Sequence, residues 1–396
     1  MTAPEWRPAK LDELGHVGRG RSRHRPRNAN FLYGGPYPFF QTGDIKAANC
    51  YLTEFSQTYS EAGLAQSKLW QPGTLCITIA ANIAESAILG IPGCFPDSVV
   101  GFIADPSRAD VRFVRYYLEI LKLRMQGISQ GATQDNLSLD KLLTFDFLVP
   151  PLTIQRRIAG ILSAYDDLIE NSQRRIKILE EMARRLYREW FVYFRFPGHE
   201  DRRFVDSQLG EIPVGWEVKN LFDLTKVNYG KNLPTKNLSD DGTYPVYGAA
   251  KIIGRHTEYT REGRTIICGS RGSVGEMQIT QPRCYVTNNS FLFDPTHPDN
   301  FFWLFLALKE RGLRDVVGGA AQPQITLEGI SSIELLSPPM PLRTRFQEIV
   351  SAMFEQGWAL DSQIQNLRRT RDLLLPRLLS GQIDVEALPE PVLSES

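Results

Sequence analysis

Five arginines stand among nine residues in the stretch RGRSRHRPR, at positions 19–27. Cationic side chains at this density repel one another unless an anion lies close by. Gly20 and Pro26 interrupt the stretch and no apolar period runs through it, so we expect a loop. Guanidinium groups bind phosphate oxygens in a bidentate manner, so a polyphosphate backbone would satisfy this loop. The stretch indicates a nucleic-acid contact, and a solvated, mobile loop is the alternative.

Further polar side chains could contact a nucleic acid. The second half of the chain carries a weaker set of cations in the region that corresponds to the arginines, and Arg271 stands among small residues in GSRGSVGE. Glutamine amides in QGATQDN (130–136) and GGAAQPQ (318–324) could pair with adenine edges in a major groove, although glutamines are also common in turns. The predicted DNA-contacting residues are Arg19, Arg21, Arg23, Arg25, Arg27, Gln41, Gln134, Lys226, Lys231, Lys236, Arg271, Gln322 and Gln324.

Sequence signatures of catalysis are missing. The chain has no GxxxxGK(S/T) phosphate loop, no GxSxG nucleophile elbow and no NPPY or DPPY tetrapeptide of the kind that holds a target base in an amino-methyltransferase. The five cysteines form no CxxC pair, and no histidine stands near them at zinc-ligand spacing. We therefore predict a binding protein with buried, reduced thiols and no metal site; an enzyme with unrecognised motifs is the alternative.

Length and composition indicate a globular protein with at least two domains. The chain has 396 residues, a hydrophobic share of 42% and a formal net charge of zero, so any attraction for an anionic partner must be local. It contains no apolar run of about 18 residues and no signal-peptide core. These features predict a cytoplasmic protein that does not contact a membrane.

A long internal repeat organises the chain. VPPLTIQRRIAGILSA (149–164) matches SPPMPLRTRFQEIVSA (337–352) at an offset of 188 residues without a gap. A looser match joins WRPAKLDEL (6–14) to WEVKNLFDL (216–224). A repeat of this length predicts two similar domains, each followed by a similar helix.

The repeated helical passages carry apolar residues at steps of three and four, which is typical of a helix with one apolar stripe. Each spans about 37 residues, or roughly 55 Å. We expect the two helices to pair as an intramolecular antiparallel coiled coil; a coiled coil between two copies of the chain is the alternative. The predicted seam is Ile154, Ile158, Ile161, Tyr165, Ile176, Leu179, Leu186, Trp190, Leu342, Phe346, Ile349, Met353, Ile364, Leu367, Leu374 and Leu378.

The predicted fold class is α+β, with two similar domains separated by the two long helices and related by a pseudo-twofold axis. Strand-like runs such as TLCITIA (74–80) and RTIICG (264–269) alternate with turns, and one helix is expected in each domain, at 111–125 and 301–315. Pro376 should kink or end the last turns of the second long helix. The expected boundaries are 1–150 and 197–337 for the domains, 151–196 and 338–380 for the helical regions, and 381–396 for a frayed tail.

Four features carry a likeness to a known family: LGEIPVGWEV (209–218), REWFVYFRFPGHE (188–200), the paired PP-containing passages and the closing LLPRLLSGQI (374–383). In these features, which span almost the whole chain, the sequence resembles the specificity subunits of Type I restriction-modification enzymes. The resemblance implies two target recognition domains, each reading one half of a split double-stranded DNA target, with the coiled coil setting the gap. Because the two halves diverge strongly in 19–36 and 226–243, we expect an asymmetric target.

The resemblance also implies partner subunits. Two methylation subunits would dock on the chain and modify one adenine in each half-site with S-adenosylmethionine, and restriction subunits would use ATP and magnesium. The chain itself would bind no cofactor, and the whole complex would be an adenine-N6 DNA methyltransferase and an ATP-dependent endonuclease. The alternatives are a specificity subunit of a related motor-less enzyme, or a coiled-coil scaffold whose two domains bind protein or sugar.

Overall fold

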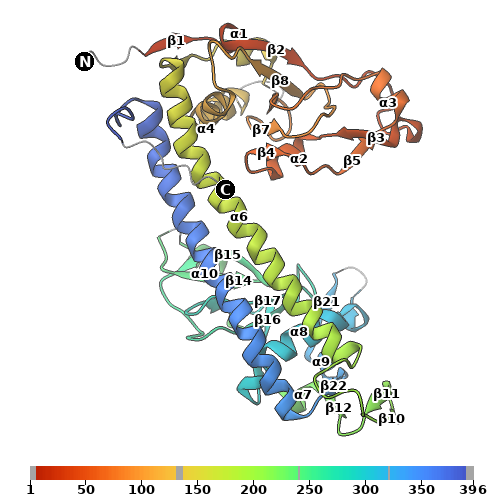
Figure 1. The fold of residues 1–396 in the computed structure, drawn as a ribbon. Coiled ribbons are helices and arrows are strands. Elements are labelled where there is room, and N and C mark those ends of the chain that lie inside the picture. The colour runs from red at the N-terminus through yellow and green to blue at the C-terminus, as the bar shows by residue number, and fades with distance from the viewer. Residues whose placement is uncertain (1–5, 131–136, 240, 320–321, 389–396) are drawn as a thin grey trace. The chain divides into compact units, whose positions relative to one another are not determined.

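The computed structural model describes residues 6–130, 137–239, 241–319 and 322–388. The chain divides into two compact units: Met1–Arg174 together with Asp361–Ser396, and Arg175–Leu360. Both units combine strands with helices, and each takes part of both long helices (Figure 1). This confirms the predicted fold class of two α+β domains joined by two long helices.

The first unit is built on a five-stranded sheet in the order β2-β8-β6-β7-β4. The central strands are buried along their length because their residues are apolar or small, as in LCIT of β6. Phe113 and Val114 of helix α4 pack with Val100 and Phe102 of β8 in the same core. The bounds are β2 Gly15–Arg19, β4 Tyr51–Leu52, β6 Leu75–Thr78, β7 Ser86–Leu89, β8 Val99–Ala104 and α4 Val111–Gln130.

Smaller elements surround this sheet. Strand β1 pairs with β9, directly ahead of the first long helix, and β3 pairs with β5. The short helix α2 leads from β3 toward β4 and lies near β6 and β7. The bounds are β1 Arg7–Ala9, α1 Leu11–Leu14, β3 Tyr33–Phe39, α2 Thr42–Ala47, β5 Gln57–Tyr59, α3 Glu61–Ala65, α5 Leu139–Leu142 and β9 Phe147–Val149.

The second unit repeats this plan. Its sheet order β13-β19-β16-β17 corresponds to β2-β8-β6-β7, and β12 pairs with β22 as β1 pairs with β9. The helix predicted at 301–315 ends at Arg311, because Gly312 adopts a φ of 69° that stops the helix. The bounds are β12 Glu217–Asn220, α7 Leu221–Leu224, β13 Thr225–Tyr229, β16 Ile266–Gly269, β17 Met277–Ile279, β19 Ser290–Pro295, α8 Phe301–Arg311, α9 Leu327–Ser331 and β22 Glu334–Ser337.

Further strands of the second unit lie outside this sheet. Strand β14 pairs with β15 and with β18, and a two-stranded ribbon, β10 with β11, follows the first long helix in the chain. The bounds are β10 Phe204–Ser207, β11 Gly210–Pro213, β14 Tyr244–Gly248, β15 Lys251–His256, β18 Tyr285–Val286, β20 Val317–Gly318 and β21 Gln324–Ile325.

The two long helices are α6 (Leu152–Tyr187) and α10 (Met340–Leu379). In the first unit, Ile154 and Ile158 from the start of α6 share a core with Leu378 from the end of α10. In the second unit, Tyr187 from the end of α6 packs against Phe346 near the start of α10, with ring centroids 6.2 Å apart. Early residues of one helix therefore meet late residues of the other within one chain, so the helices pair antiparallel.

The predicted seam residues differ in burial. Ile349 is 38% exposed, and the next residue, Val350, is fully buried in the second core instead. Six seam residues are buried: Ile154, Ile158, Trp190, Phe346, Ile364 and Leu378. The remaining nine are half-buried: Ile161, Tyr165, Ile176, Leu179, Leu186, Leu342, Met353, Leu367 and Leu374.

The end of the chain differs from the expectation of a frayed tail. Helix α10 continues through Pro376 and ends at Leu379. Beyond it, Val385 is buried in the first core, and the Arg157 guanidinium donates a hydrogen bond to the carbonyl oxygen of Leu388. Val385 departs from the expectation because its apolar side chain packs in the core, whereas most residues of 381–388 are exposed. Residues 389–396 lie outside the described part.

Two further expectations from composition can be compared with the structure. All five cysteines are buried and unpaired, as predicted. Burial raises the pKa of the Cys268 thiol to about 12, which keeps it protonated and unreactive. No helix in the described residues is long and apolar enough to cross a membrane.

Candidate nucleic-acid interface

The arginine-rich stretch 19–27 follows directly from the end of β2 and forms the predicted loop, which we call the arginine loop. Its backbone is held from two sides. Gly20 N donates to Val99 O at 2.9 Å, and a side chain at Gly20 would bring a Cβ within 2.2 Å of a neighbouring carbonyl oxygen. On the other side, Ser67 Oγ donates to Arg21 O at 2.8 Å, and His24 N donates to the Gln66 side chain at 3.0 Å. The loop is therefore anchored to the folded domain.

The arginine loop uses its guanidinium groups in two ways, although all five arginines are exposed. Arg27 makes a two-pronged ion pair with Asp97, with both Nη2–Oδ distances at 2.9 Å, and Arg19 donates to the Asp97 carbonyl oxygen at 2.6 Å. Arg25 donates to two carbonyl oxygens of the loop itself. Within the described residues, the guanidinium groups of Arg21 and Arg23 have neither a hydrogen-bond acceptor nor a carboxylate partner. Three arginines thus stabilise the loop, and two are available to an external anion.

Lys68 adds a cation that the sequence did not indicate. Its Nζ lies 3.6 Å from the centroid of the Trp70 ring. Burial, followed by the positive charge of Arg21, lowers the pKa of Lys68. Within the described residues Lys68 makes no ion pair, so two neighbouring cations lack a compensating carboxylate. A phosphate oxygen would supply the missing negative charge. Lys68 was missed because only tertiary contacts bring it beside a loop some 45 residues earlier in the chain.

The predicted amides of the first unit contribute less to this surface. Gln41 is half-buried, and its Nε2 donates to Gln57 Oε1 at 2.8 Å, so its amide is partly used within the domain. Its backbone N–H donates to Asp44 at 2.7 Å at the start of α2. Gln134 lies outside the described residues.

In the second unit the predicted residues lie on strands and turns near the sheet. Lys226 is exposed on β13, Lys231 follows that strand and bonds through its backbone to Val286, and Lys236 is exposed in a short turn. No ion pair involves these lysines within the described residues. The structure brings Arg271 and Gln324 together, because their backbones form an isolated bridge. Gln322 is exposed two residues before Gln324.

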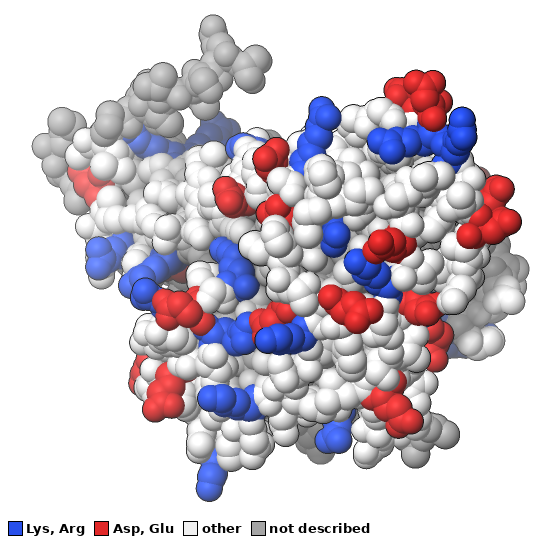
Figure 2. Space-filling model, turned by 90° about the horizontal axis from the view of Figure 1, so that it is seen from below, with Lys and Arg blue, Asp and Glu red and all other residues white. Residues whose placement is uncertain are grey.

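Charge elsewhere is mixed. On the face drawn in Figure 2, lysine and arginine side chains are interspersed with aspartate and glutamate, and no single sign dominates. This pattern agrees with the net charge of zero. Attraction for a polyanion would therefore depend on local groups such as Arg21, Arg23 and Lys68.

Comparison with known proteins gives consistent matches over almost the whole chain. A family model described as the Type I restriction modification DNA specificity domain matches residues 4–181 and 213–367. The chain is 25% identical to the Type I restriction enzyme MjaIX specificity subunit of Methanocaldococcus jannaschii, across 97% of this chain and 95% of the relative. It is 21% identical to the EcoprrI specificity subunit of Escherichia coli, across 93% and 90%.

A solved structure supports the fold. The crystal structure of a Type I restriction-modification system S subunit from M. genitalium superposes with a TM-score of 0.62 at 18% identity, covering 96% of this chain and 97% of that one. At this level of identity the match concerns the fold.

Proposed function

The chain belongs to the family of the Type I restriction-modification DNA specificity domain, and from that premise we propose that it reads a bipartite DNA target for a Type I complex. Each unit would act as a target recognition domain for one half of the target. The paired helices α6 and α10 would set the separation of the two half-sites. The proposal rests most directly on Arg21, Arg23 and Lys68, which carry positive charge on a fixed surface and have no counter-ion among the described residues.

Contacts to the phosphate backbone would position each domain, and side chains that reach base edges would read sequence. In the first unit the arginine loop and Lys68 supply the positioning contacts. In the second unit the lysines of β13 and of the following turns would do so, with Arg271 and Gln324 as candidates for base contact. Because the two units present different side chains at these places, the two half-sites should differ in sequence.

The chemistry would reside in partner subunits. Two methylation subunits would transfer a methyl group from S-adenosylmethionine to one adenine in each half-site, and restriction subunits would use ATP and magnesium to cut DNA. The present chain would be non-catalytic, would bind none of these cofactors and would work in the cytoplasm. Its role would be to determine where the complex binds.

Incubating the purified chain with labelled S-adenosylmethionine and plasmid DNA tests this division of labour. We expect no methyl transfer by the chain alone, and transfer to adenine N6 once its methylation subunits are added. Transfer by the chain alone would contradict the proposal and favour a self-sufficient enzyme. A specificity subunit of a motor-less enzyme would instead support cutting beside the target without ATP in the full complex.

A further inference from the structure

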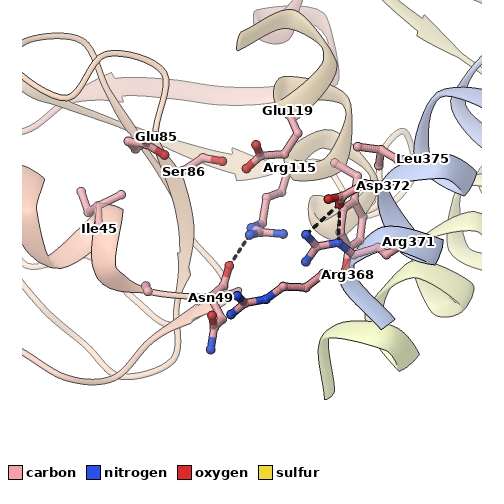
Figure 3. A pocket seen from close by; sticks show the side chains of 12 residues that line it. Ile45, Asn49, Glu85, Ser86, Arg115, Glu119, Arg368, Arg371, Asp372 and Leu375 are labelled. Atoms are coloured by element: carbon pink, nitrogen blue, oxygen red, sulfur yellow. Dashed lines mark hydrogen bonds and ion pairs between the residues drawn. The ribbon is translucent and has the colours of Figure 1, made fainter. Parts of the chain in front are cut away.

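A polar pocket of about 270 Å³ lies in the first unit, between the recognition domain and the last turns of α10 (Figure 3). Its walls include Ser86 of β7, Arg115 of α4, and Arg368 and Arg371 of α10. Figure 3 shows the three arginine side chains pointing toward one another from the two helices. None of these residues belongs to the arginine loop.

The pocket lies beside a buried ion-pair cluster. Asp166 of α6 is 5% exposed, pairs with Arg371 at 2.5 Å and accepts a hydrogen bond from the Tyr116 hydroxyl at 2.6 Å. Arg115 lies 3.7 Å from the same carboxylate and donates to the carbonyl oxygen of Asn49. Removing this many charges from water is costly, and well-packed apolar residues can often replace them without loss of stability.

The internal repeat shows that the fold can be built without these charges. Helices α4 and α8 begin at Val111 and Phe301, an offset of 190 that places Phe305 at the position of Arg115. The long-helix offset of 188 places Phe354 at the position of Asp166. Phe305 and Phe354 contact each other in the second unit, with ring centroids 5.9 Å apart. The same junction is thus aromatic in one unit and charged in the other, so the fold does not require charged residues at this place.

The groups without partners indicate what the pocket binds. The lining carboxylates are already paired: Glu85 with Lys122 at 2.7 Å, Asp372 with Arg371 at 2.8 Å, and Glu119 with Lys122 at 3.9 Å.

The unsatisfied groups are mainly hydrogen-bond donors. Ser86 Oγ and Arg115 Nε are buried without a hydrogen-bond partner among the described residues, and Ser86 is 5% exposed. The Arg368 guanidinium has no carboxylate partner in the described part of the chain. Buried donors without acceptors are uncommon in folded proteins, so these groups could donate to an acceptor that enters the pocket.

We propose that this pocket binds an oxyanion of the phosphate class. Arg368 would supply a fork of donors to the oxyanion, and Arg115 Nε and Ser86 Oγ would complete its coordination. The oxyanion could be a free phosphate group or a phosphate of the DNA backbone. Only the second source rests on the proposed function, so a free phosphate would be bound even by a chain that does not read DNA.

The test uses the full-length chain and two substitutions at the pocket, Arg368→Ala and Ser86→Ala. Arg369→Ala is the matched control, because Arg369 is exposed on α10 as Arg368 is, but does not line the pocket. Thermal unfolding is followed while inorganic phosphate replaces chloride at constant ionic strength. We expect phosphate to raise the unfolding temperature of the wild type and of Arg369→Ala, and each pocket variant to require about tenfold more phosphate for the same shift.

Binding of a random-sequence DNA duplex distinguishes the two sources. If the oxyanion is a backbone phosphate, Arg368→Ala weakens duplex binding and reduces its salt dependence, whereas Arg369→Ala does not. If the oxyanion is free phosphate, Arg368→Ala and Arg369→Ala bind the duplex equally well. Arg368→Ala then differs only in the smaller rise of its unfolding temperature with phosphate. The proposal is overturned if two results occur together. Phosphate raises the unfolding temperature of the wild type no more than chloride does, and Arg368→Ala and Arg369→Ala bind the duplex equally well.

Discussion

The arginine loop gives a quantitative prediction, because the structure separates its arginines by what they already bind. In the described part of the chain the guanidinium groups of Arg21 and Arg23 have no partner, whereas that of Arg27 pairs with Asp97. In the double variant Arg21→Ala, Arg23→Ala, two phosphate contacts should be lost. Each contact contributes about 0.9 to the slope of log affinity against log salt, so the slope should fall by about 1.8. Measured at about 0.1 M salt, this corresponds to a roughly 60-fold weaker binding of duplex DNA.

Fluorescence anisotropy with a labelled duplex, repeated at several salt concentrations, measures both quantities. Arg27→Ala serves as the comparison, since the Arg27 guanidinium supports the loop through Asp97. This substitution should change the slope by less than the value of about 0.9 that one phosphate contact contributes. The preferred target sequence should stay the same in the double variant, because phosphate contacts carry no base information. An unchanged slope would refute the assignment of these two arginines to phosphate, and a shifted target sequence would mean that they touch bases.

Three further predictions concern single side chains. Burial and the neighbouring Arg21 lower the pKa of Lys68, and a bound phosphate should raise it, so duplex binding should take up a proton and weaken as the pH rises toward the ordinary lysine pKa of about 10.4. Lys68→Arg should remove this dependence, and equal pH profiles for the two proteins would contradict it. Asp166→Ala leaves the buried Arg115 guanidinium without a carboxylate and removes one of the two carboxylate partners of the half-buried Arg371, so it should cost about 3 kcal/mol in urea unfolding. The exposed neighbour Asp167→Ala should cost less than about 0.5 kcal/mol, and similar losses would refute the buried ion pair. Phe346→Ala removes a fully buried ring and should lower the free energy of unfolding in urea by about 3–5 kcal/mol, whereas the exposed Ile349→Ala should lower it much less. The reverse order would mean that the buried face of α10 is assigned wrongly.

Features repeated over many residues could be read from the sequence. The apolar steps of three and four predicted α6 and α10, and the runs TLCITIA and RTIICG contain the buried strands β6 and β16. These features are local, so periodicity and propensity are sufficient to predict them. The offset of 188 residues indicated two similar domains because a long internal repeat encodes the same arrangement of elements twice.

Features that depend on tertiary contacts could not be read in this way. Nothing in RGRSRHRPR indicates that the Arg27 guanidinium pairs with Asp97 while that of Arg21 finds no partner among the described residues, because Asp97 is 70 residues further along the chain than Arg27. Val350 lies in the core and Ile349 does not, which depends on how α10 is rotated about its own axis. The apolar pattern of the sequence does not fix this rotation to within one residue. The pocket of the first unit joins segments more than 300 residues apart, so no local pattern marks it.

Selection of bound sequences from a pool of random duplexes, with the chain assembled with its methylation subunits, measures bipartite recognition most directly. We expect the enriched duplexes to contain two short, different half-sites separated by a spacer of fixed length and unconstrained sequence. Enrichment of a single contiguous site, or no enrichment at all, would contradict the assignment of one half-site to each unit.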